Sequence, residues 1–567
     1  MSTIIDETAL SGVERVKLES LGLRFPLAEE ILNDATHLSE EAMQLMKFHG
    51  SYQQEDRDQR KERKRAGLEP AYSFMIRSKL PGGVLTADQY LLHDDLTDKY
   101  GDGTLRVTTR QGFQLYGILK GNLQATLHEL NEQLVTTFGA CGDVVRNVCT
   151  CPAPLKDSNR REVIALATLI RDQTLPKSTS YHDIWVEGVN VTREVEPVPD
   201  PLYGDRYLPR KFKISFAFPD DNCTDLHSND LGFFVIEQDG EIVGYNIVVG
   251  GGFGSTHGKA ETFARLADDL GFVTPEEVLE VTHAIIKVQR DHGNRENRKR
   301  SRLKYLIHDR GIAWFREQVE ERLGRKLQDS APMEVTGIHD HLGWHDQGDG
   351  RLFYGVFIEN GRIKDEGDFR LRSALRKIVE KLRVNVHLTM QHNLLLTDVL
   401  PEQRDEIEGI LRSHGVKPYA EVTNVRRYAM ACPALPTCPL AVAESERALP
   451  AVVDQLEVEL AEMGLGSEDL TVRMTGCPNG CARPYTAEIA FVGRSLGKYM
   501  VYVGGNAEGT RLGTVYADLV PTAELLSTVK PLLEQYRAGR LDGEPFGDFL
   551  VRTGIEPLPS AAPRAAR

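Results

Sequence analysis

Apolar positions recur along the chain in two ways, as short runs typical of strands and as longer patterns typical of helices. Residues 72–117 show both. An apolar run predicts a strand, Pro81-Gly82-Gly83 predicts a turn, residues 88–100 predict a helix, and residues 105–118 predict another strand. Alternating strands and helices favour mixed layers, so we expect an α/β fold with mixed α+β character.

The sequence also contains a weak internal repeat. Residues 106–118 resemble residues 386–399, which aligns Gln111 with Gln391 at an offset of 280. Cys151-Pro152-Ala153 recurs as Cys432-Pro433-Ala434 at an offset of 281, and residues 244–252 resemble residues 498–506, where each strand ends in a glycine turn. We interpret the chain as two pseudo-equivalent halves with one ligand site at their interface. Chance similarity between short apolar strands is the alternative.

Length and charge exclude several classes of protein. With 567 residues and 41% hydrophobic content, the chain can form about three or four domains. The formal net charge of −15 disfavours a nucleic-acid partner, because phosphate binding depends on lysine and arginine. The chain has no apolar run of the roughly 18 residues that a membrane helix needs, and its first residues lack the pattern of a signal peptide. We therefore expect a cytoplasmic protein without a membrane partner.

Four of the eight cysteines form two pairs, Cys432-x5-Cys438 and Cys477-x3-Cys481. Four thiolates suit either tetrahedral zinc or an iron-sulfur cluster. The five-residue gap is awkward for a zinc knuckle, so the spacing favours a cluster over structural zinc or unliganded core cysteines. Neighbouring prolines stiffen both loops, and Gly476 and Gly480 let the backbone approach a bulky group. The other cysteines show no second complete set and are expected to be buried thiols: Cys141, Cys149, Cys151 and Cys223.

Several basic residues of the first half lie in segments that otherwise predict buried strands or turns. Buried cations need anionic partners, so their grouping indicates an anion site. On a strand, Lys211 and Lys213 point to one face and Arg210 to the other, so the lysines can converge on one small anion. Taken singly, each is more typical of a surface, and two of the arginines could cap a sheet edge. The set is Arg77, Arg106, Arg110, Arg146, Arg210, Lys211 and Lys213.

Two further basic stretches are typical of solvated helix faces. One ends the charge-rich segment of residues 1–70, at Arg57, Arg60, Lys61, Arg63, Lys64 and Arg65. The other comprises Arg295, Arg298, Lys299, Arg300, Arg302 and Lys304. The second stretch could alternatively steer an acidic ferredoxin toward the chain.

Five motifs together resemble the sirohaem-containing sulfite reductase haemoprotein family, over about residues 49–555. They are TGCPNGCARPY, MACPALPTCPLA, VRNV, LPRKFK and TTRQGFQLYGI. The resemblance implies an internally duplicated sulfite/nitrite reductase fold with ferredoxin-like half-domains and two larger α/β domains. It also implies a sirohaem and a 4Fe-4S cluster held by Cys432, Cys438, Cys477 and Cys481, with Cys481 as the axial thiolate to the sirohaem iron.

The resemblance assigns roles to the basic residues as well. Arg77, Arg146, Lys211 and Lys213 match positions that contact the substrate anion, which makes them candidate catalytic residues. The matches near the sirohaem carboxylates are Arg106, Thr108, Arg110, Gln114 and Arg210. Tyr116 departs from the family, which often has histidine there, so that one macrocycle contact is in doubt.

The pattern and the resemblance together predict six segments. They are an N-terminal helical arm (1–70), a ferredoxin-like half-domain (71–140), a sirohaem and substrate domain (141–335), a second half-domain (336–420), an iron-sulfur cluster domain (421–556) and a disordered tail (557–567).

The function implied is the assimilatory six-electron reduction of sulfite to sulfide, for cysteine biosynthesis. No GxGxxG motif follows a strand, so the chain needs an electron donor, either an NADPH-oxidising flavoprotein subunit, which we favour, or a ferredoxin. Nitrite is the alternative substrate, with ammonia as its product. A non-catalytic zinc-binding scaffold is the alternative of a different class.

Overall fold

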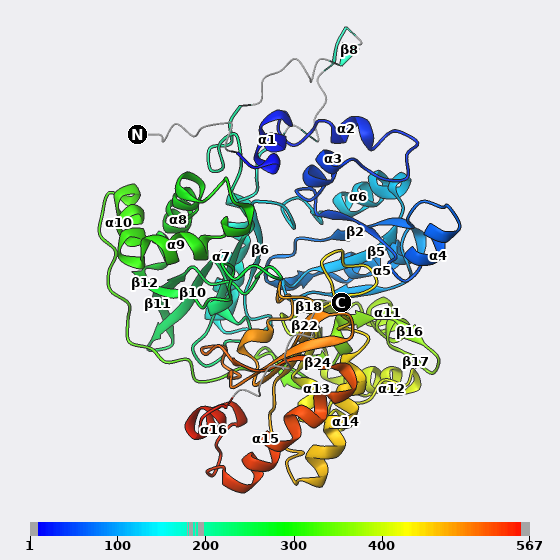
Figure 1. Cartoon of the computed structure of the whole chain (residues 1–567), viewed down its shortest axis with the longest axis vertical. Coiled ribbons are helices and arrows are strands. Elements are labelled where there is room, and N and C mark those ends of the chain that lie inside the picture. Colours follow the sequence, from blue (N-terminus) through cyan, green and yellow to red (C-terminus); the bar gives the residue numbers. More distant parts are fainter. Residues whose placement is uncertain (1–9, 179, 181–184, 188, 191–197, 557–567) are drawn as a thin grey trace, which may run out of the picture.

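The computed structural model describes residues 10–178, 180, 185–187, 189–190 and 198–556. The predicted tail, residues 557–567, lies outside the described residues. Figure 1 shows the first large α/β region (green) beside the first ferredoxin-like half-domain (blue), with the C-terminal α/β region (orange and red) below both and the second half-domain, which carries α11 (Leu371–Leu382) and α12 (Arg404–Ser413), at its side. No helix in the described part of the chain is long and apolar enough to cross a membrane.

The first ferredoxin-like half-domain is an antiparallel sheet covered by two helices. Its strands lie in the order β1-β2-β5-β4. The helix α5 (Ala87–Lys99) begins at a capping box, in which Thr86 and Gln89 satisfy each other's backbone N–H groups. The other elements are β1 (Ser51–Glu55), β2 (Tyr72–Arg77), β4 (Leu105–Val107), β5 (Phe113–Ile118) and α6 (Leu123–Glu132).

The second half-domain repeats this arrangement with the strand order β13-β14-β19-β18. Its apolar stripe is strong: α11 (Leu371–Leu382) buries Leu371, Ala374, Leu375, Ile378 and Val379. The remaining elements are β13 (Gly343–Asp346), β14 (Leu352–Val356), β18 (Asn385–Leu388), β19 (Leu394–Val399) and α12 (Arg404–Ser413).

The two half-domains exchange a short strand. β3 (Val84–Leu85), from the first, pairs with β18 of the second, where Leu85 faces Val386. β15 (Arg362–Ile363), from the second, pairs with β4 of the first, where Arg362 faces Arg106. The fifth strand of each half-domain sheet therefore comes from the other half-domain.

Two larger sheets carry the rest of the fold, and their topologies are identical. In the first, β6 and β9 are parallel, as are β9 and β10, whereas β11 and β12 run antiparallel to their neighbours. β20 to β24 follow the same pattern. The first sheet comprises β6 (Val145–Cys149), β9 (Phe212–Ala217), β10 (Leu231–Gln238), β11 (Glu241–Val249) and β12 (Asp268–Val273). The second comprises β20 (Ala429–Ala431), β21 (Val472–Thr475), β22 (Ile489–Ser495), β23 (Lys498–Val503) and β24 (Thr514–Pro521).

Helices cover both large sheets, and the second sheet has a hydrophobic core of its own. Around the first sheet lie α7 (Ser158–Gln173), α8 (Val278–His292), α9 (Leu303–Arg310) and α10 (Ile312–Leu323). Around the second lie α13 (Asn424–Arg427), α14 (Leu449–Glu462), α15 (Leu525–Gly539) and α16 (Phe546–Thr553). Two small hairpins, β7 (Trp185–Val186) with β8 (Val189–Asn190) and β16 (Asp365–Glu366) with β17 (Phe369–Arg370), complete the strands.

The predicted duplication is confirmed, but the predicted alignment of Gln111 with Gln391 is wrong by one residue. Thr108 and Thr389 each cap the equivalent turn, and the backbone N–H of each donates to the carbonyl oxygen of Gly112 or Asn393. The residues with positive φ in these turns are Gln111 and His392. The offset in the turns is thus 281, the same as for the Cys-Pro-Ala match.

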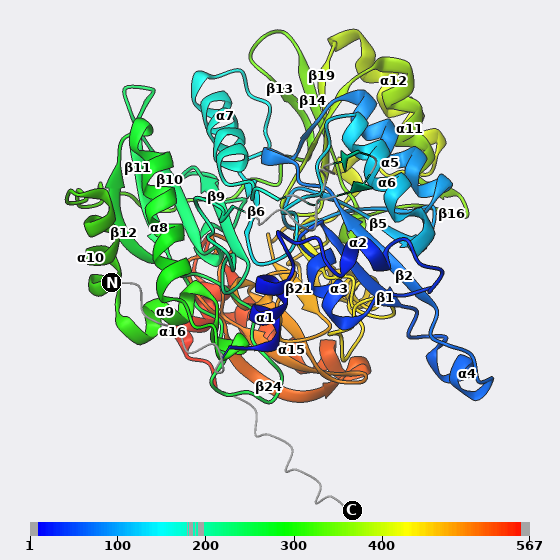
Figure 2. The same cartoon turned by 90° about the horizontal axis from the view of Figure 1, so that it is seen from above.

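The N-terminal segment contains a strand as well as helices. Its helices are α1 (Gly12–Glu19), α2 (Leu27–Glu30), α3 (Glu40–Met46) and α4 (Arg60–Arg65). β1 lies between α3 and α4 and pairs along its whole length with β2, so this segment is part of the first half-domain sheet. Figure 2 shows α4 projecting from the body of the molecule.

Candidate active site

A cavity of about 230 Å³ lies between the half-domains and the second large sheet. All four predicted ligand cysteines line it, together with four of the predicted cations. The predicted residues that line it are Arg77, Arg106, Thr108, Gln114, Arg146, Lys211, Cys432, Cys438, Cys477 and Cys481. The geometry therefore brings together two sets of residues that lie hundreds of positions apart in the sequence.

The cysteines sit on two loops at the carboxyl ends of the parallel strands β20 and β21. Cys432 follows β20 directly, and Cys477 and Cys481 belong to the turn after β21. The Gly476 N–H donates to Cys432 Sγ at 3.3 Å, and the Asn479 side-chain amide donates to Cys481 Sγ at 3.2 Å. Such hydrogen bonds to sulfur stabilise thiolates that bind an iron-sulfur cluster.

Gly476 and Gly480 are required by this loop. A Cβ atom at position 476 would lie 2.5 Å from Ala434 Cβ and 2.6 Å from the Ala443 carbonyl oxygen. Gly480 has a φ of 65°, which L side chains rarely adopt. The close packing at Gly476 and the backbone conformation of Gly480 thus both exclude a larger residue, while the predicted approach of this backbone to a bulky group stays a prediction.

The thiols of Cys432, Cys438 and Cys477 have raised pKa values, so they resist ionisation when no positive charge lies among them. Burial, and then the neighbouring Cys481, raise the pKa of Cys432 to about 12. The pKa values of Cys438 and Cys477 are raised for the same two reasons. Thiolates at this place therefore need a cationic centre, which is what a group of iron ions supplies. The donor set fits an iron-sulfur cluster.

Two of the four lining cations, Arg106 and Arg146, are held by backbone carbonyl groups, and Arg106 also lies beside one carboxylate. Arg146 donates to the carbonyl oxygens of Gly142, at 2.9 Å, and Ala140, at 3.2 Å. Arg106 donates to the carbonyl oxygen of Ala431, at 2.8 Å, and its Nε lies 3.2 Å from the Glu446 carboxylate. Carbonyl groups orient these guanidinium groups without neutralising them, so most of the positive charge of the wall remains available to an anion.

Within the cavity lining, Gln114 connects the Tyr116 hydroxyl to the Arg77 guanidinium. The Gln114 amide lies 2.8 Å from the Tyr116 hydroxyl, and with its oxygen toward Arg77 it accepts from Nε at 3.2 Å. Arg77 also lies 3.5 Å from Cys141 Sγ. Tyr116, the residue that departs from the family pattern, is buried and lines the cavity.

Three predicted site residues lie outside the cavity lining: Arg110, Arg210 and Lys213. Arg110 is buried and donates to Asn229 Oδ1 at 2.6 Å, Ser215 Oγ at 3.2 Å and the Ile214 carbonyl oxygen at 2.8 Å, so it joins β4–β5 to the first large sheet. Arg210 lies 3.6 Å from Asp143. Arg110 therefore ties this turn to the first large sheet, and its predicted place near the sirohaem carboxylates stays a prediction.

The two lysines are strongly influenced by their surroundings. Burial, then Arg110 and Arg302, lower the pKa of Lys213 to about 7. Burial, then Lys213, lower the pKa of Lys211 far below its ordinary value. Lys211 and Lys213 lie on either side of Phe212, at the start of β9, and Lys213 is one cause of the Lys211 shift. Lys211 lines the cavity and Lys213 does not, so the convergence of the pair on one anion stays a prediction.

Four buried polar atoms of the described cavity lining have no hydrogen-bond partner: Gln54 Oε1, His392 Nδ1, Thr475 Oγ1 and Arg106 Nε, the last of which lies beside the Glu446 carboxylate. Burial and the nearby Arg106 keep the pKa of His392 well below its ordinary value, so the ring is neutral. Buried polar groups without partners are rare and indicate a missing polar ligand. The cavity lining therefore offers cations and unpaired polar atoms to an anionic ligand.

Sequence reasoning missed residues that brace the cysteine loops. Arg57 Nη1 donates to the carbonyl oxygens of Cys438, at 3.1 Å, and Ala441, at 2.6 Å. Asp225 pairs with Arg473 and with Arg483, both at 2.9 Å, and all three are buried. Arg57 belongs to the first basic stretch, for which the sequence predicted only a solvated helix face. Nothing in the sequence of that stretch distinguishes Arg57 from its basic neighbours.

The second basic stretch is neither a solvated helix face nor a docking patch. Arg295, Arg302 and Lys304 are buried. Arg302 pairs with Asp230 at 2.8 Å, and Lys304 donates to the carbonyl oxygens of Gly252 and Gly254. Only Lys299 of the six is exposed. The acidic and carbonyl partners lie far away in sequence, which is why the pattern predicted a surface.

Comparison with protein families agrees with this architecture. The model of the nitrite and sulphite reductase 4Fe-4S domain matches residues 166–327 and 422–564. The model of the nitrite/sulfite reductase ferredoxin-like half domain matches residues 67–133 and 345–414. The chain belongs to the nitrite and sulfite reductase family.

Relatives match over nearly their full length. A Staphylococcus saprophyticus protein named sulfite reductase [NADPH] hemoprotein beta-component is 44% identical over 96% of both chains. The protein of the same name from Geobacillus thermodenitrificans is 45% identical over 96% of both chains. A Synechococcus elongatus protein named sulfite reductase [ferredoxin] is 45% identical over 98% of this chain and 92% of its own.

The structure of the NirA protein of Mycobacterium tuberculosis shares the fold. It superposes with a TM-score of 0.75 over 96% of both chains, at 24% sequence identity. Duplicated ferredoxin-like half-domains with two 4Fe-4S-type domains are therefore the fold of this chain.

Proposed function

We propose that the chain is the haemoprotein component of a sulfite reductase and reduces sulfite to sulfide with six electrons. One observation carries this proposal: a single cavity is lined both by four cysteine thiols and by Arg77, Arg106, Arg146 and Lys211. A sulfur ligand set beside a cationic pocket suits electron transfer to a small oxyanion. The relatives named above support sulfite as that anion.

The residues suited to hold the cofactors are those of the cavity wall. Cys432, Cys438, Cys477 and Cys481 would bind a 4Fe-4S cluster, and Cys481 would also bind the sirohaem iron. Arg106, Thr108 and Gln114 would face the sirohaem carboxylates, with Arg110 and Arg210 behind them. When bound, the two groups supply single electrons in sequence at one iron centre.

The protein side of the reaction is binding and protonation. Sulfite carries up to two negative charges near neutral pH, and Arg77, Arg146 and Lys211 offset that charge at the cavity wall. Each of the three oxygen atoms leaves as water, so protons must reach the anion. Lys213, with its pKa near 7, is the group best matched to give up a proton at neutral pH. The arginines stay charged and orient the anion.

Electrons would enter through the Cys438 loop. Pro439 and Leu440, next to this cysteine, are exposed, whereas Cys432 and Cys477 are buried. Arg57 joins this loop to the segment that leads into α4, and most side chains of α4 are exposed and basic. We propose that an NADPH-oxidising flavoprotein docks here, with a ferredoxin as the second candidate. Two of the three relatives named above carry NADPH in their names, and one carries ferredoxin.

The test uses the purified holoprotein with a chemically reduced dye, so that no donor protein is needed. We expect sulfide from sulfite, with a higher kcat/KM for sulfite than for nitrite. A preparation with full iron and acid-labile sulfide that forms no sulfide contradicts the proposal. A higher kcat/KM for nitrite would make this chain a nitrite reductase.

Donor docking is tested separately by reversing charge on α4. The triple variant Lys61→Glu, Lys64→Glu and Arg65→Glu should slow donor-driven sulfide formation and leave dye-driven formation unchanged. The double reversal of Lys377 and Lys381, which are exposed on α11, is the matched control. Measuring each variant with the flavoprotein and then with ferredoxin identifies the donor. Equal effects in the two variants contradict docking at α4.

A further inference from the structure

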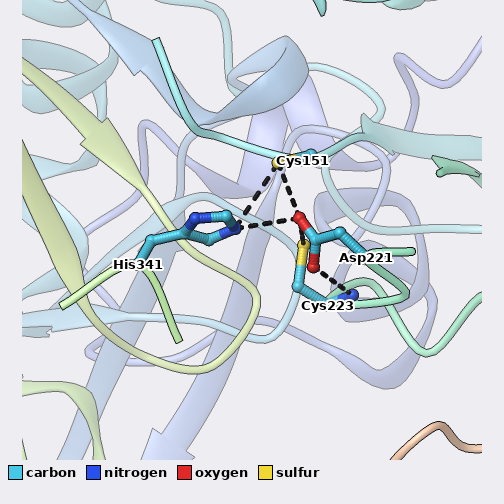
Figure 3. A group of neighbouring side chains, drawn as sticks. All are labelled: Cys151, Asp221, Cys223 and His341. Carbon is cyan, nitrogen blue, oxygen red and sulfur yellow. Dashed lines mark hydrogen bonds and ion pairs between the residues drawn. The ribbon is translucent and has the colours of Figure 1, made fainter. Parts of the chain in front are cut away.

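A second cluster of metal-ligating side chains lies away from the cavity. Cys151, Asp221, Cys223 and His341 place their ligand atoms within 4.8 Å of one another, and all four residues are buried (Figure 3). None of them lines the cavity described above. The sequence predicted both cysteines to be buried thiols, and they are buried, but it did not predict their grouping with a carboxylate and an imidazole.

Asp221 is the centre of this cluster. Its Oδ2 lies 3.0 Å from Cys151 Sγ, 3.5 Å from Cys223 Sγ and 3.0 Å from His341 Nε2. Cys151 Sγ lies 3.5 Å from His341 Nε2. Backbone N–H groups of Cys223, at 3.2 Å, and His339, at 3.1 Å, donate to the other oxygen, Oδ1. The carboxylate is thus fixed with one oxygen toward the two thiols and the imidazole.

The two cysteines occupy the places that cluster cysteines occupy in the other half. Cys223 lies eight residues before β10, and Cys481 lies eight residues before the equivalent strand β22. Two residues after each cysteine, Asp225 and Arg483 have positive φ and precede a short 3₁₀ turn. Cys151 precedes Pro-Ala just beyond β6, as Cys432 does just beyond β20.

We propose that Cys151, Asp221, Cys223 and His341 bind one zinc ion. Zinc takes four ligands in a tetrahedron, with bonds of about 2.3 Å to sulfur and about 2.0–2.1 Å to nitrogen and oxygen, which separates neighbouring ligand atoms by about 3.4–3.8 Å. The separations of 3.0–3.5 Å given above require only small adjustments. Two thiolates with one imidazole and one carboxylate suit zinc in preference to magnesium or calcium.

Four protein ligands leave no open position, so the site is structural. Its ligands come from the ends of β6 and β9 and from the segment that precedes β13. The ion therefore ties the first large sheet to the start of the second half-domain. Arg160, whose guanidinium packs 4.6 Å above the Phe218 ring, lies beside Cys151 and offsets the negative charge of a two-thiolate, one-carboxylate site.

A metal-free cluster is the alternative. The thiols and the imidazole would then all donate to the single oxygen Oδ2, or the two cysteines would form a disulfide bond. The three states differ in metal content and in covalent linkage, so they can be distinguished by measurement.

The experiment measures zinc and iron in the same sample of the full-length holoprotein by mass spectrometry. We expect about one zinc per chain in the wild type, retained in His339→Ala and lost in His341→Ala and Cys223→Ser. His339 is a matched control because it is exposed and lies two residues from His341. The two variants that lose zinc should also unfold at a lower temperature, because structural zinc contributes to folding.

X-ray absorption at the zinc edge of the wild type does not depend on any variant folding. We expect two sulfur neighbours at about 2.3 Å and two nitrogen or oxygen neighbours at about 2.0–2.1 Å. Four sulfur neighbours would place the zinc in an empty cluster site and overturn the proposal. Three further results would also overturn the proposal. They are an iron-replete protein that holds no zinc after growth with added zinc, equal zinc content in the His339→Ala and His341→Ala variants, and a Cys151–Cys223 disulfide in native peptide maps.

Discussion

The two large sheets have the same strand order and the same turns, yet they carry different side chains at equivalent places. Beyond the second sheet, Cys432, Cys477 and Cys481 face the cavity. Beyond the first sheet the corresponding turn positions hold Cys151, Pro219 and Cys223, and the first half contributes cations to the cavity instead. The difference teaches that a duplicated backbone fixes where a side chain stands, whereas the residue type decides what chemistry occurs there.

The largest effect is expected from exchanging equivalent cysteines. Cys432→Ser should abolish sulfite reduction and remove iron and acid-labile sulfide, because a cluster iron loses its thiolate. Cys151→Ser, its counterpart in the first half, should keep the iron content of the wild type. Iron analysis and the visible spectrum check both variants. If Cys432→Ser and Cys151→Ser lost the same amount of iron, the two halves would not differ in cluster binding as described above.

Lys213 tests whether the first half supplies protons as well as charge. Its pKa near 7 means that it holds a proton below about pH 7 and loses it above, so wild-type kcat should fall as the pH rises through 7. Lys213→Met should lower kcat roughly 10²–10⁴-fold and remove that limb of the profile. Lys213→Arg keeps the charge but gives up no proton at neutral pH. Near-normal turnover in the arginine variant would show that charge alone is sufficient.

Arg77 tests the binding of the anion. Arg77→Met should lower kcat/KM for sulfite roughly 10- to 100-fold, mainly through KM, because a charge-assisted hydrogen bond to the anion is lost. Lys79→Met is the matched control, since Lys79 is buried two residues further on and donates to the Val145 carbonyl oxygen at 3.1 Å. Its KM should not change. Steady-state kinetics with reduced dye would refute the assignment if KM rose equally in both variants.

The smallest effect is expected where the half-domains contact each other. Asp94 on α5 is buried and pairs with Arg372 and Arg376 on α11, both at 2.6 Å. Asp94→Ala should destabilise the fold by roughly 2 kcal/mol, or roughly 2 °C in Tm, because both arginines keep other partners. Asp95→Ala removes an exposed pair and should shift Tm less. Calorimetry checks both, and a change in turnover at 25 °C would argue against a purely structural role.

The sequence predicted much of the site because its signals were local. Cysteine spacing indicated the two loops that carry Cys432, Cys438, Cys477 and Cys481. Cations in apolar segments indicated the four basic residues that line the same cavity. The register of the repeat was wrong by one residue because it depends on the positive φ of Gln111 and His392, which residue type does not reveal. The contacts of Arg110 with Ser215 and Asn229 were not predicted, because these partners lie about a hundred residues away in the sequence.

Grouping across long distances was the other limit. His341 reaches Asp221 from a segment 120 positions later in the chain, and sequence spacing alone does not indicate such a meeting. The exchanged strands β3 and β15 have two residues each, which is too short for a hydrophobic period. Contacts of both kinds depend on the tertiary fold, and so they appear only in the structure.

The exchange of β3 and β15 has a consequence for biosynthesis. During translation, β4 of the first half-domain presents a bare edge until Arg362 and Ile363 have left the ribosome, about two thirds of the way along the chain. Open strand edges capture other chains. The nascent chain is therefore open to self-association at this edge for a little under half of its synthesis, and slower elongation beyond residue 118 would prolong that exposure.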